Sequence, residues 1–215
     1  MIPHFLELMT HPEHAWEEIR QDEDRNSFHY LPHLLLLALI PAISLFIGTT
    51  RVGWSLVEDE RVMLTTMSAF QLSALLYLTI MLGTLLMGWF IRWMSRTFDS
   101  RPTFNQCVGF MAYIATPYFI AGLAALYPSR WLALAVLLLA SGYATFLLYV
   151  GLPRFMRIGN EQAFPYASSI WGVGLLVLVT ILVSMILHWQ YVLLPDYERP
   201  TIQDQAYPTQ DERPQ

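Results

Sequence analysis

Two pairs of histidines near the amino terminus are the side chains best suited to bind a metal ion. His11 and His14 are three residues apart, and His29 and His33 are four apart, so each pair shares one face of a helix. Histidine nitrogens are common zinc ligands. However, no Asp, Glu or Cys joins either pair at a spacing typical of a metal site. We therefore predict interfacial histidines with no bound metal or cofactor, and name His29 and His33 as the residues to test.

A serine and a histidine on two separate apolar segments suggest a second kind of chemistry, that of intramembrane serine proteases. Those enzymes carry their serine in a Gly-x-Ser-Gly turn, whereas the first position of that pattern is Leu139 here, before Ser141 and Gly142. His188 lies beside Trp189, in a setting typical of an aromatic belt at the membrane interface. We therefore predict that Ser141 is a small packing residue and that the protein is not an enzyme.

The segment from Tyr113 to Pro117 is the most unusual apolar stretch of the chain. Pro117 has no backbone N–H for the carbonyl of Tyr113, which favours a bend. The hydroxyl of Thr116 is expected to bond back to the carbonyl of Ala112 or Tyr113. The bend either shapes the bundle, or acts as a hinge or as the wall of a small polar cavity. Pro41 frees the carbonyl of Leu37 in the same way and predicts a second kink.

Five stretches of the chain contain no Asp, Glu, Lys or Arg, and the shortest is 23 residues long. They are 26–50, 62–91, 102–129, 131–153 and 162–195. A helix of about 20 apolar residues crosses a hydrocarbon core of roughly 30 Å. Backbone polar groups must be paired within lipid, so each stretch is predicted to be a membrane-spanning helix. The composition agrees, because 13% of residues are charged against about 25% in soluble domains.

Small residues four apart predict where two of these helices approach others closely. Thr84 and Gly88 form one such stripe, and Ser168 and Gly172 form another. Helix middles lack Asp, Glu, Arg and Lys, which argues against an ion-coupled pump but leaves a passive channel open.

The two terminal regions outside the spans are acidic. Residues 1–25 are expected to form a cytoplasmic interfacial segment with a short amphipathic helix. In it Thr10 caps the helix, Pro12 lies in the first turn, Glu13 completes a capping box, and Trp16 lies on the apolar face. Residues 26–194 form the membrane domain, and the acidic tail 195–215 is predicted to be disordered.

Arginine, the only basic residue apart from histidine, predicts the orientation. The connections between spans 2–3 and 4–5 hold five, which are Arg92, Arg96, Arg101, Arg154 and Arg157, while the other two connections hold Arg51, Arg61 and Arg130. By the positive-inside rule the amino terminus is cytoplasmic and the carboxyl terminus is outside.

Several short motifs, taken in order along the chain, resemble one family. They are His11-Pro12 with Trp16 and Ile19, Tyr113-x-Ala-Thr116-Pro117, then Gly122, Tyr127, Pro128 and Trp131, and finally Tyr149-Val150-Gly151-Leu152-Pro153 leading to Met156. In this order they resemble the Yip domain family, the Ypt-interacting proteins, in its bacterial branch. The resemblance covers the chain to about residue 192 and implies a five-helix bundle with a cytoplasmic amino terminus. It supplies no catalytic residues. Eukaryotic relatives bind prenylated GTPases in vesicle traffic, which the bacterial branch lacks.

We therefore expect an all-α, polytopic membrane protein with about five transmembrane helices preceded by a short interfacial amphipathic helix. The resemblance implies the bacterial inner membrane as its location. Its partners are expected to be bilayer lipid and membrane proteins, including further copies of this chain, and not nucleic acid. The expected function is non-enzymatic organisation of protein or lipid partners. The alternative is a passive channel or a transporter of small solutes or metal ions, with a continuous polar path that joins Gln71, Tyr113, Thr116 and the small residues of spans 4 and 5.

Overall fold

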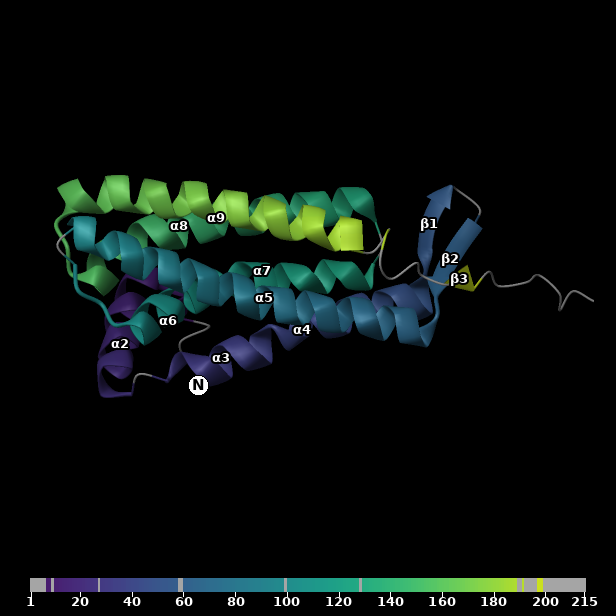
Figure 1. The fold of residues 1–215 in the computed structure, drawn as a ribbon, viewed down its shortest axis with the longest axis horizontal. Helices are drawn as coiled ribbons and strands as arrows, with labels where there is room; N and C mark the ends of the chain where they lie inside the picture. Colours follow the sequence, from purple (N-terminus) through teal and green to yellow (C-terminus); the bar gives the residue numbers. More distant parts are fainter. Residues whose placement is uncertain are drawn as a thin grey trace, which may run out of the picture.

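The protein is a bundle of long helices, drawn in Figure 1 from a computed structural model. The structure describes residues 7–198 except 9, 27, 58–59, 99, 128, 189–190 and 192–196. The helices are α2 (Pro12–Arg25), α3 (Tyr30–Leu37), α4 (Leu39–Ile47), α5 (Thr66–Ser95), α6 (Phe104–Ile114), α7 (Thr116–Ala121), α8 (Arg130–Met156) and α9 (Asn160–His188). A π-helical turn η1 (Gly48–Val52) and two 3-10 turns, η2 (Arg96–Phe98) and η3 (Gly122–Leu126), extend three of them.

Five segments of the bundle are long and apolar enough to cross a membrane, as predicted. Four are the helical stretches Tyr30–Val52, Thr66–Phe98, Trp131–Met156 and Glu161–Leu187. The fifth is the pair Phe104–Ile114 and Thr116–Leu126, which is bent by 42°. This pair counts as one crossing, because α6 begins at the end of the bundle where α5 stops and η3 packs on α4 at the other end (Figure 1). The chain is therefore an all-α, multi-pass membrane protein.

The first crossing is interrupted where its proline predicts. The helix breaks at Ala38, between α3 and α4. This is one residue after Leu37, whose carbonyl receives no hydrogen bond from Pro41 because proline has no backbone N–H. Gly122 lies against this region, and a Cβ there would come within 2.6 Å of the Pro41 Cα. The bend of the first crossing therefore packs directly against the end of the third.

Helix α2 packs into the bundle through the apolar face that the sequence predicts. Ala15, Trp16 and Ile19 are fully buried, and the Trp16 ring lies 4.9 Å from that of Phe110 in α6. Gly151 in α8 leaves the space that the Trp16 indole fills. Because α2 contributes to the core, it acts as a structural part of the bundle.

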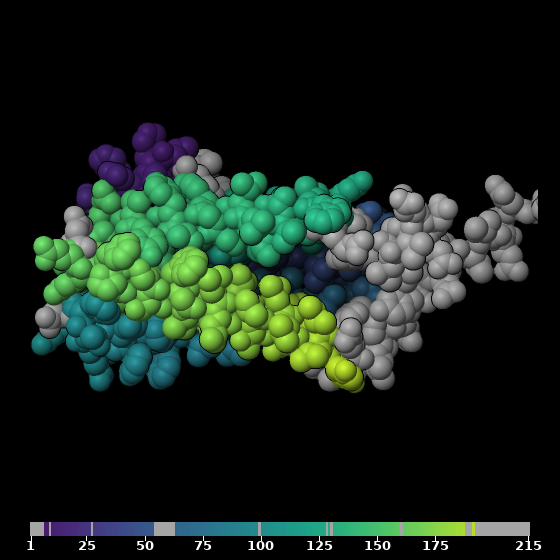
Figure 2. Space-filling view, turned by 90° about the horizontal axis from the view of Figure 1, so that it is seen from above, coloured from purple at the N-terminus to yellow at the C-terminus, as the bar shows by residue number. Residues whose placement is uncertain are grey.

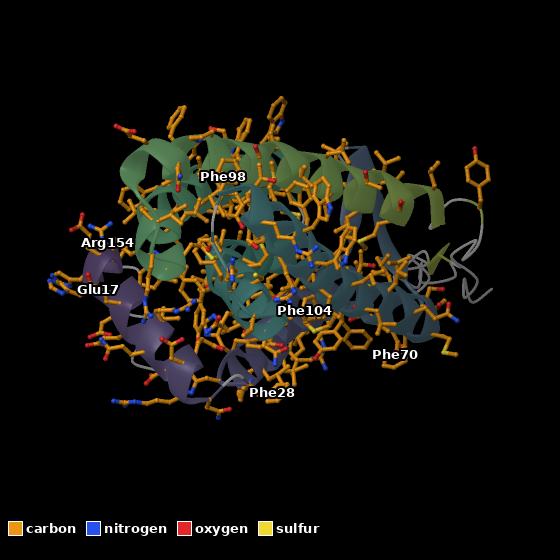
Figure 3. All side chains as sticks on the ribbon, turned by 60° about the vertical axis from the view of Figure 1, so that its left-hand side comes forward. Glu17, Phe28, Phe70, Phe98, Phe104 and Arg154 are labelled. Carbon is orange, nitrogen blue, oxygen red and sulfur yellow. The ribbon has the colours of Figure 1, made fainter. Side chains whose placement is uncertain are left out.

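The start of α2 differs from the prediction. The residue before its first turn is His11, and its side chain does not cap the helix. Thr10 instead belongs to a helical turn that precedes α2. The predicted capping box is not formed, because the carboxylate of Glu13 pairs with the guanidinium of Arg154 at 3.0 Å. Figure 3 shows Arg154 reaching from α8 toward α2. An ion pair with another helix has replaced the local cap.

A small antiparallel sheet at the end of the bundle opposite α2 was not predicted. Strands β1 (Trp54–Val57) and β2 (Glu60–Leu64) form a hairpin, and β3 (Tyr197–Glu198) pairs with β2 (Figure 1). The strands stand outside the membrane helices, so the fold class is unchanged. Two residues of the tail 195–215 thus take part in structure, while the rest of it lies outside the described residues, and its predicted disorder stays a prediction.

The two small-residue stripes behave differently. Gly88 permits close approach of α5 to α6, since a Cβ there would lie 2.9 Å from the Val108 Cα. Gly172 in α9, however, has nothing within 4 Å of such a Cβ, and Ser168 instead meets the hydroxyl of Tyr149 at 2.9 Å. The predicted close approach is therefore wrong at Gly172, which has open space beside it, while Ser168 meets α8 through the longer side chain of Tyr149.

Candidate functional site

The bend in the third crossing and the histidine of the first crossing form one polar junction. The Nε2 atom of His33 lies 3.0 Å from the Thr116 hydroxyl, and its ring lies 4.5 Å from that of Tyr113. Thr116 and Tyr113 are buried. Three residues that the sequence singled out for separate reasons thus meet between α3, α6 and α7.

This junction corrects one detail of the predicted bend. The hydroxyl of Thr116 faces His33 on another helix, and no bond to the carbonyl of Ala112 or Tyr113 is formed. The backbone N–H of Ala115 donates to the carbonyl of Met111 at 2.9 Å, where α6 ends. Pro117 lies in the first turn of α7, a position that needs no N–H donor. The bend therefore forms without a bond from the threonine hydroxyl to its own helix, and the threonine joins two crossings.

A buried carboxylate lies close to this junction. Glu23 of α2 is 1% exposed and packs against Gly109 of α6. A Cβ atom added at Gly109 would lie 3.2 Å from the Oε1 atom of Glu23. Neither carboxylate oxygen has a hydrogen-bond partner of good geometry among the described residues. Burial raises the pKa of Glu23 to about 7, with the backbone of Tyr30 and the charge of Arg20 opposing it and Asp22 reinforcing it. A carboxyl group that titrates near neutrality therefore sits where α2 meets the membrane helices.

The burial of Glu23 was not predicted, although the sequence contains a signal for it. Trp16, Ile19 and Glu23 lie at spacings of three and four, so they share the face of α2 that is buried. The acidic composition of residues 1–25 favoured a solvent-facing interpretation of every carboxylate. The position of Glu23 on the apolar face of α2, rather than its charge, determines that it is buried.

Ion pairs surround Glu23 but belong to its neighbours. Asp24 contacts Arg20 at 3.3 Å and Arg157 at 2.8 Å, and accepts from the Gln106 amide at 2.8 Å. Burial lowers the pKa of Arg20, against the opposing effect of Asp24. These contacts bind α2 to α6 and to the end of α8.

The two candidate metal ligands have separate partners. His29 faces Asp22 at 3.9 Å, whereas His33 faces Thr116. No group of three or more His, Cys, Asp or Glu side chains suited to a metal ion occurs among the described residues. The absence of a resident metal stays a prediction.

A cavity of about 440 Å³ lies between α5, α6, α7, α8 and α9, within the membrane-spanning part of the bundle. Figure 2 shows the hollow between α8 and α9, toward the end that carries the strands. Apolar side chains dominate its wall, among them Met87, Ile114, Phe119, Leu148 and Ile170. A cavity with such a wall is suited to hydrocarbon rather than to water or ions.

The hydroxyl groups on the cavity wall are already engaged. Ser141 donates to the carbonyl of Leu137 and accepts from Tyr118 at 3.2 Å. Thr84 donates to its own helix, at the carbonyl of Ile80. Because each hydroxyl is paired, the wall offers few polar groups to a ligand.

The serine protease hypothesis gains no support from this geometry. Ser141 donates its proton to a carbonyl of its own helix, so no base activates it there. The side chain of His188 lies outside the described residues, although its backbone ends α9.

The remaining predicted motif residues are structural in position. Pro12 lies in the first turn of α2, and Pro41 lies in α4 against Gly122. Gly151 accommodates Trp16, and Pro153 lies in the last turns of α8, where its carbonyl accepts from Ile158. The motif residues of the amino-terminal segment and of α8 therefore form one contact between α2 and α8.

Comparison with known proteins identifies one family and similar proteins from two bacterial strains. The Yip1 domain family matches residues 6–181. Inner membrane protein YohC of Escherichia coli strain K12 is 37% identical over 188 residues, which are 87% of this chain and 96% of YohC. YohC of Escherichia coli O6:H1 matches to the same extent. No solved structure matches the chain. With the family match across most of its length and YohC so similar from end to end, the chain belongs to the Yip1 domain family.

Proposed function

We propose that the protein is a non-enzymatic lipid-binding component of the bacterial inner membrane, which holds an acyl chain of a bilayer lipid in the cavity beside α8 and α9. The observation that carries this proposal is the apolar wall of a cavity of about 440 Å³ at membrane depth. An engineered apolar cavity of about 150 Å³ is already large enough to bind benzene. A bound chain would fix the protein to particular lipids and so organise its surroundings.

Hydrocarbon is the natural occupant because of where the cavity opens. The outer faces of α8 and α9 carry exposed leucines, such as Leu139 and Leu176, so lipid chains surround both helices. A chain that enters the hollow replaces empty space with dispersion contacts on all sides. The inner-membrane location rests on the likeness to YohC.

The test compares two glycines that line the cavity with one that does not. Gly142 and Gly174 lie on its wall, and leucine at both positions would fill it. Gly172 is open to its surroundings without lining the cavity, so Gly172→Leu is the matched control. Native mass spectrometry of the protein in mild detergent should show lipid retention about tenfold lower in Gly142→Leu/Gly174→Leu, which corresponds to roughly 1.4 kcal/mol. Equal retention in all three proteins would refute the proposal.

The orientation is proposed separately, with the amino terminus in the cytoplasm. The arginine-rich connections meet α2 at one end of the bundle, which supports it (Figure 1). Reporter fusions after residues 98 and 158 should then report cytoplasm, and fusions after 58 and 200 should report the outside. A cytoplasmic tail would contradict an odd number of crossings.

No observation on the described residues favours the passive channel. Its polar path required Gln71 to join Tyr113 and Thr116, but Gln71 is exposed while the other two are buried. None of these three residues lines the cavity, whose wall is mostly apolar.

A further inference from the structure

A second, polar pocket of about 420 Å³ lies where α5 turns into α6. It is lined by Arg92, Ser95, Arg96, Ser100, Arg101 and Pro102. Three of its six lining residues are arginines. Neither the family nor the cavity between α8 and α9 accounts for this pocket.

The backbone of the pocket is held in place by its own hydrogen bonds. Arg92 donates to the carbonyl of Pro102 at 2.8 Å, and the backbone N–H of Ser100 donates to the carbonyl of Ser95 at 3.1 Å. The Ser100 hydroxyl donates to the carbonyl of Met156 in α8 at 3.3 Å. Thr103 then caps α6 with a full capping box. The arginines therefore project from a fixed frame.

These arginines differ from the others at the same end of the bundle. Arg20, Arg154 and Arg157 each pair with a carboxylate of α2. No carboxylate among the described residues pairs with Arg92, Arg96 or Arg101. Asp99, the acidic residue of this stretch, lies outside the described residues. The pocket thus presents guanidinium groups that lack a counter-ion in the described part of the chain.

The pocket also lies at the depth of the lipid headgroups. Trp89 and Trp93, in the last two turns of α5, are 58% and 60% exposed, and tryptophans on a membrane helix gather at the interface. Guanidinium groups bind phosphate oxygens through paired, charge-assisted hydrogen bonds. We propose that this pocket binds a phosphate group, presented either by an anionic phospholipid or as free phosphate in the aqueous phase. The proposal is independent of the proposed acyl-chain site.

The test uses the full chain purified in mild detergent. Arg96→Gln/Arg101→Gln removes two guanidinium groups while Arg92 continues to hold Pro102. The matched control is Arg25→Gln/Arg157→Gln, which removes two exposed arginines that have carboxylate partners at the same end. Native mass spectrometry measures the affinity for phosphatidylglycerol and phosphatidylcholine. Titration with inorganic phosphate in the absence of lipid forms the second arm, and thermal unfolding checks each variant.

We expect the wild type and the control to prefer phosphatidylglycerol by about tenfold or more, and Arg96→Gln/Arg101→Gln to lose that preference. That result identifies a lipid headgroup as the source. Binding of inorganic phosphate that is lost in the same variant, without a lipid preference, identifies free phosphate. If the glutamine variant does not fold, Arg96→Lys/Arg101→Lys should bind the ligand several-fold more weakly than the wild type, because lysine cannot bind two oxygens in parallel. Binding of neither ligand, an equal loss in the control, or unchanged affinity in the lysine variant would overturn the proposal.

Discussion

Helices α6 and α9 are both apolar, yet they have opposite roles in the bundle. The buried residues of α6 include Gln106, Cys107, Val108, Gly109, Phe110, Ala112, Tyr113 and Ile114, which is most of its 11 residues. In α9 the buried residues, Ala163, Tyr166, Ala167 and Ile170, all lie in the first half. Beyond Ile170 the helix turns toward lipid and borders the cavity. Hydropathy shows that both helices enter the membrane, but not which of them forms its protein core.

The difference follows from how helices associate in lipid. Lipid tails are as apolar as leucine, so close packing and polar contacts decide which surfaces meet. Gly109 lets Glu23 and Tyr30 approach α6, and Tyr166 donates to the carbonyl of Ile91 at 2.6 Å at the packed end of α9. Phe98 stacks on Tyr166 there, with ring centres 4.7 Å apart. The second half of α9 has large aliphatic residues on a surface that lipid covers equally well.

The largest expected loss of stability in the packed part of the bundle is at Trp16. Trp16→Ala should lower the free energy of unfolding by about 3–5 kcal/mol, because the indole fills the space left by Gly151 and contacts Phe110 and Phe155. Trp131→Ala is the control, since that side chain is 79% exposed, and it should change stability by less than about 0.5 kcal/mol. Steric-trap unfolding in bicelles measures both. Equal losses would show that the α2 end is no better packed than the rest.

Glu23 gives the packed end a dependence on pH. Its pKa is about 7 in the folded protein against 4.5 for an ordinary glutamate, so folding favours the protonated form. Stability should therefore fall as pH rises from about 4.5 to 7 and level off above 7, a loss of about 3 kcal/mol at most. Glu23→Gln should remove most of this slope, while Glu17→Gln on the exposed face should keep it. Unfolding measured between pH 5 and 8 that shows the same slope in Glu23→Gln would assign the titration to another group.

Two glycines compare the packed and open regions directly. Gly122→Ala should cost about 1–3 kcal/mol, because its Cβ would collide with Pro41 where backbone atoms leave no room. Gly142→Ala on the cavity wall meets nothing within 4 Å and should be neutral or slightly stabilising. Denaturant unfolding of the two variants side by side provides the measurement. A costly Gly142→Ala would mean that the hollow is closed in solution.

Pro117 distinguishes the two interpretations of the bent crossing. Pro117→Ala permits a straighter helix, which would displace the junction with α3, so a loss of about 1–3 kcal/mol is expected if the bend shapes the bundle. Steric-trap unfolding should be run together with an assay of cellular phenotype. A variant of full stability that has lost its phenotype would identify Tyr113–Pro117 as a working hinge.

Local features of this fold were predictable and pairings between helices were not. The charge-free stretches determined the five crossings, and Pro41 and Pro117 determined where two of them break, because both effects act within one helix. The hairpin at β1 and β2 was not predicted because it lies in a short, charged connection with little apolar pattern. The cavity and the open face at Gly172 depend on which helices are neighbours. Single-sequence patterns do not encode that information.

The pairing of His33 with Thr116 allows a final, smaller test of the packed region. Thr116→Val keeps the shape of the side chain and removes its hydroxyl, so it should cost about 1 kcal/mol, as other hydrogen bonds inside membranes do. His33→Leu removes the same contact from the other side, and the ring contact with Tyr113 as well. If the contact is the shared cause, the double variant should cost less than the sum of the two single variants by about the energy of that bond. Additive losses would show that the two side chains are neighbours without coupling, and that the α6–α7 bend is held by backbone and packing alone.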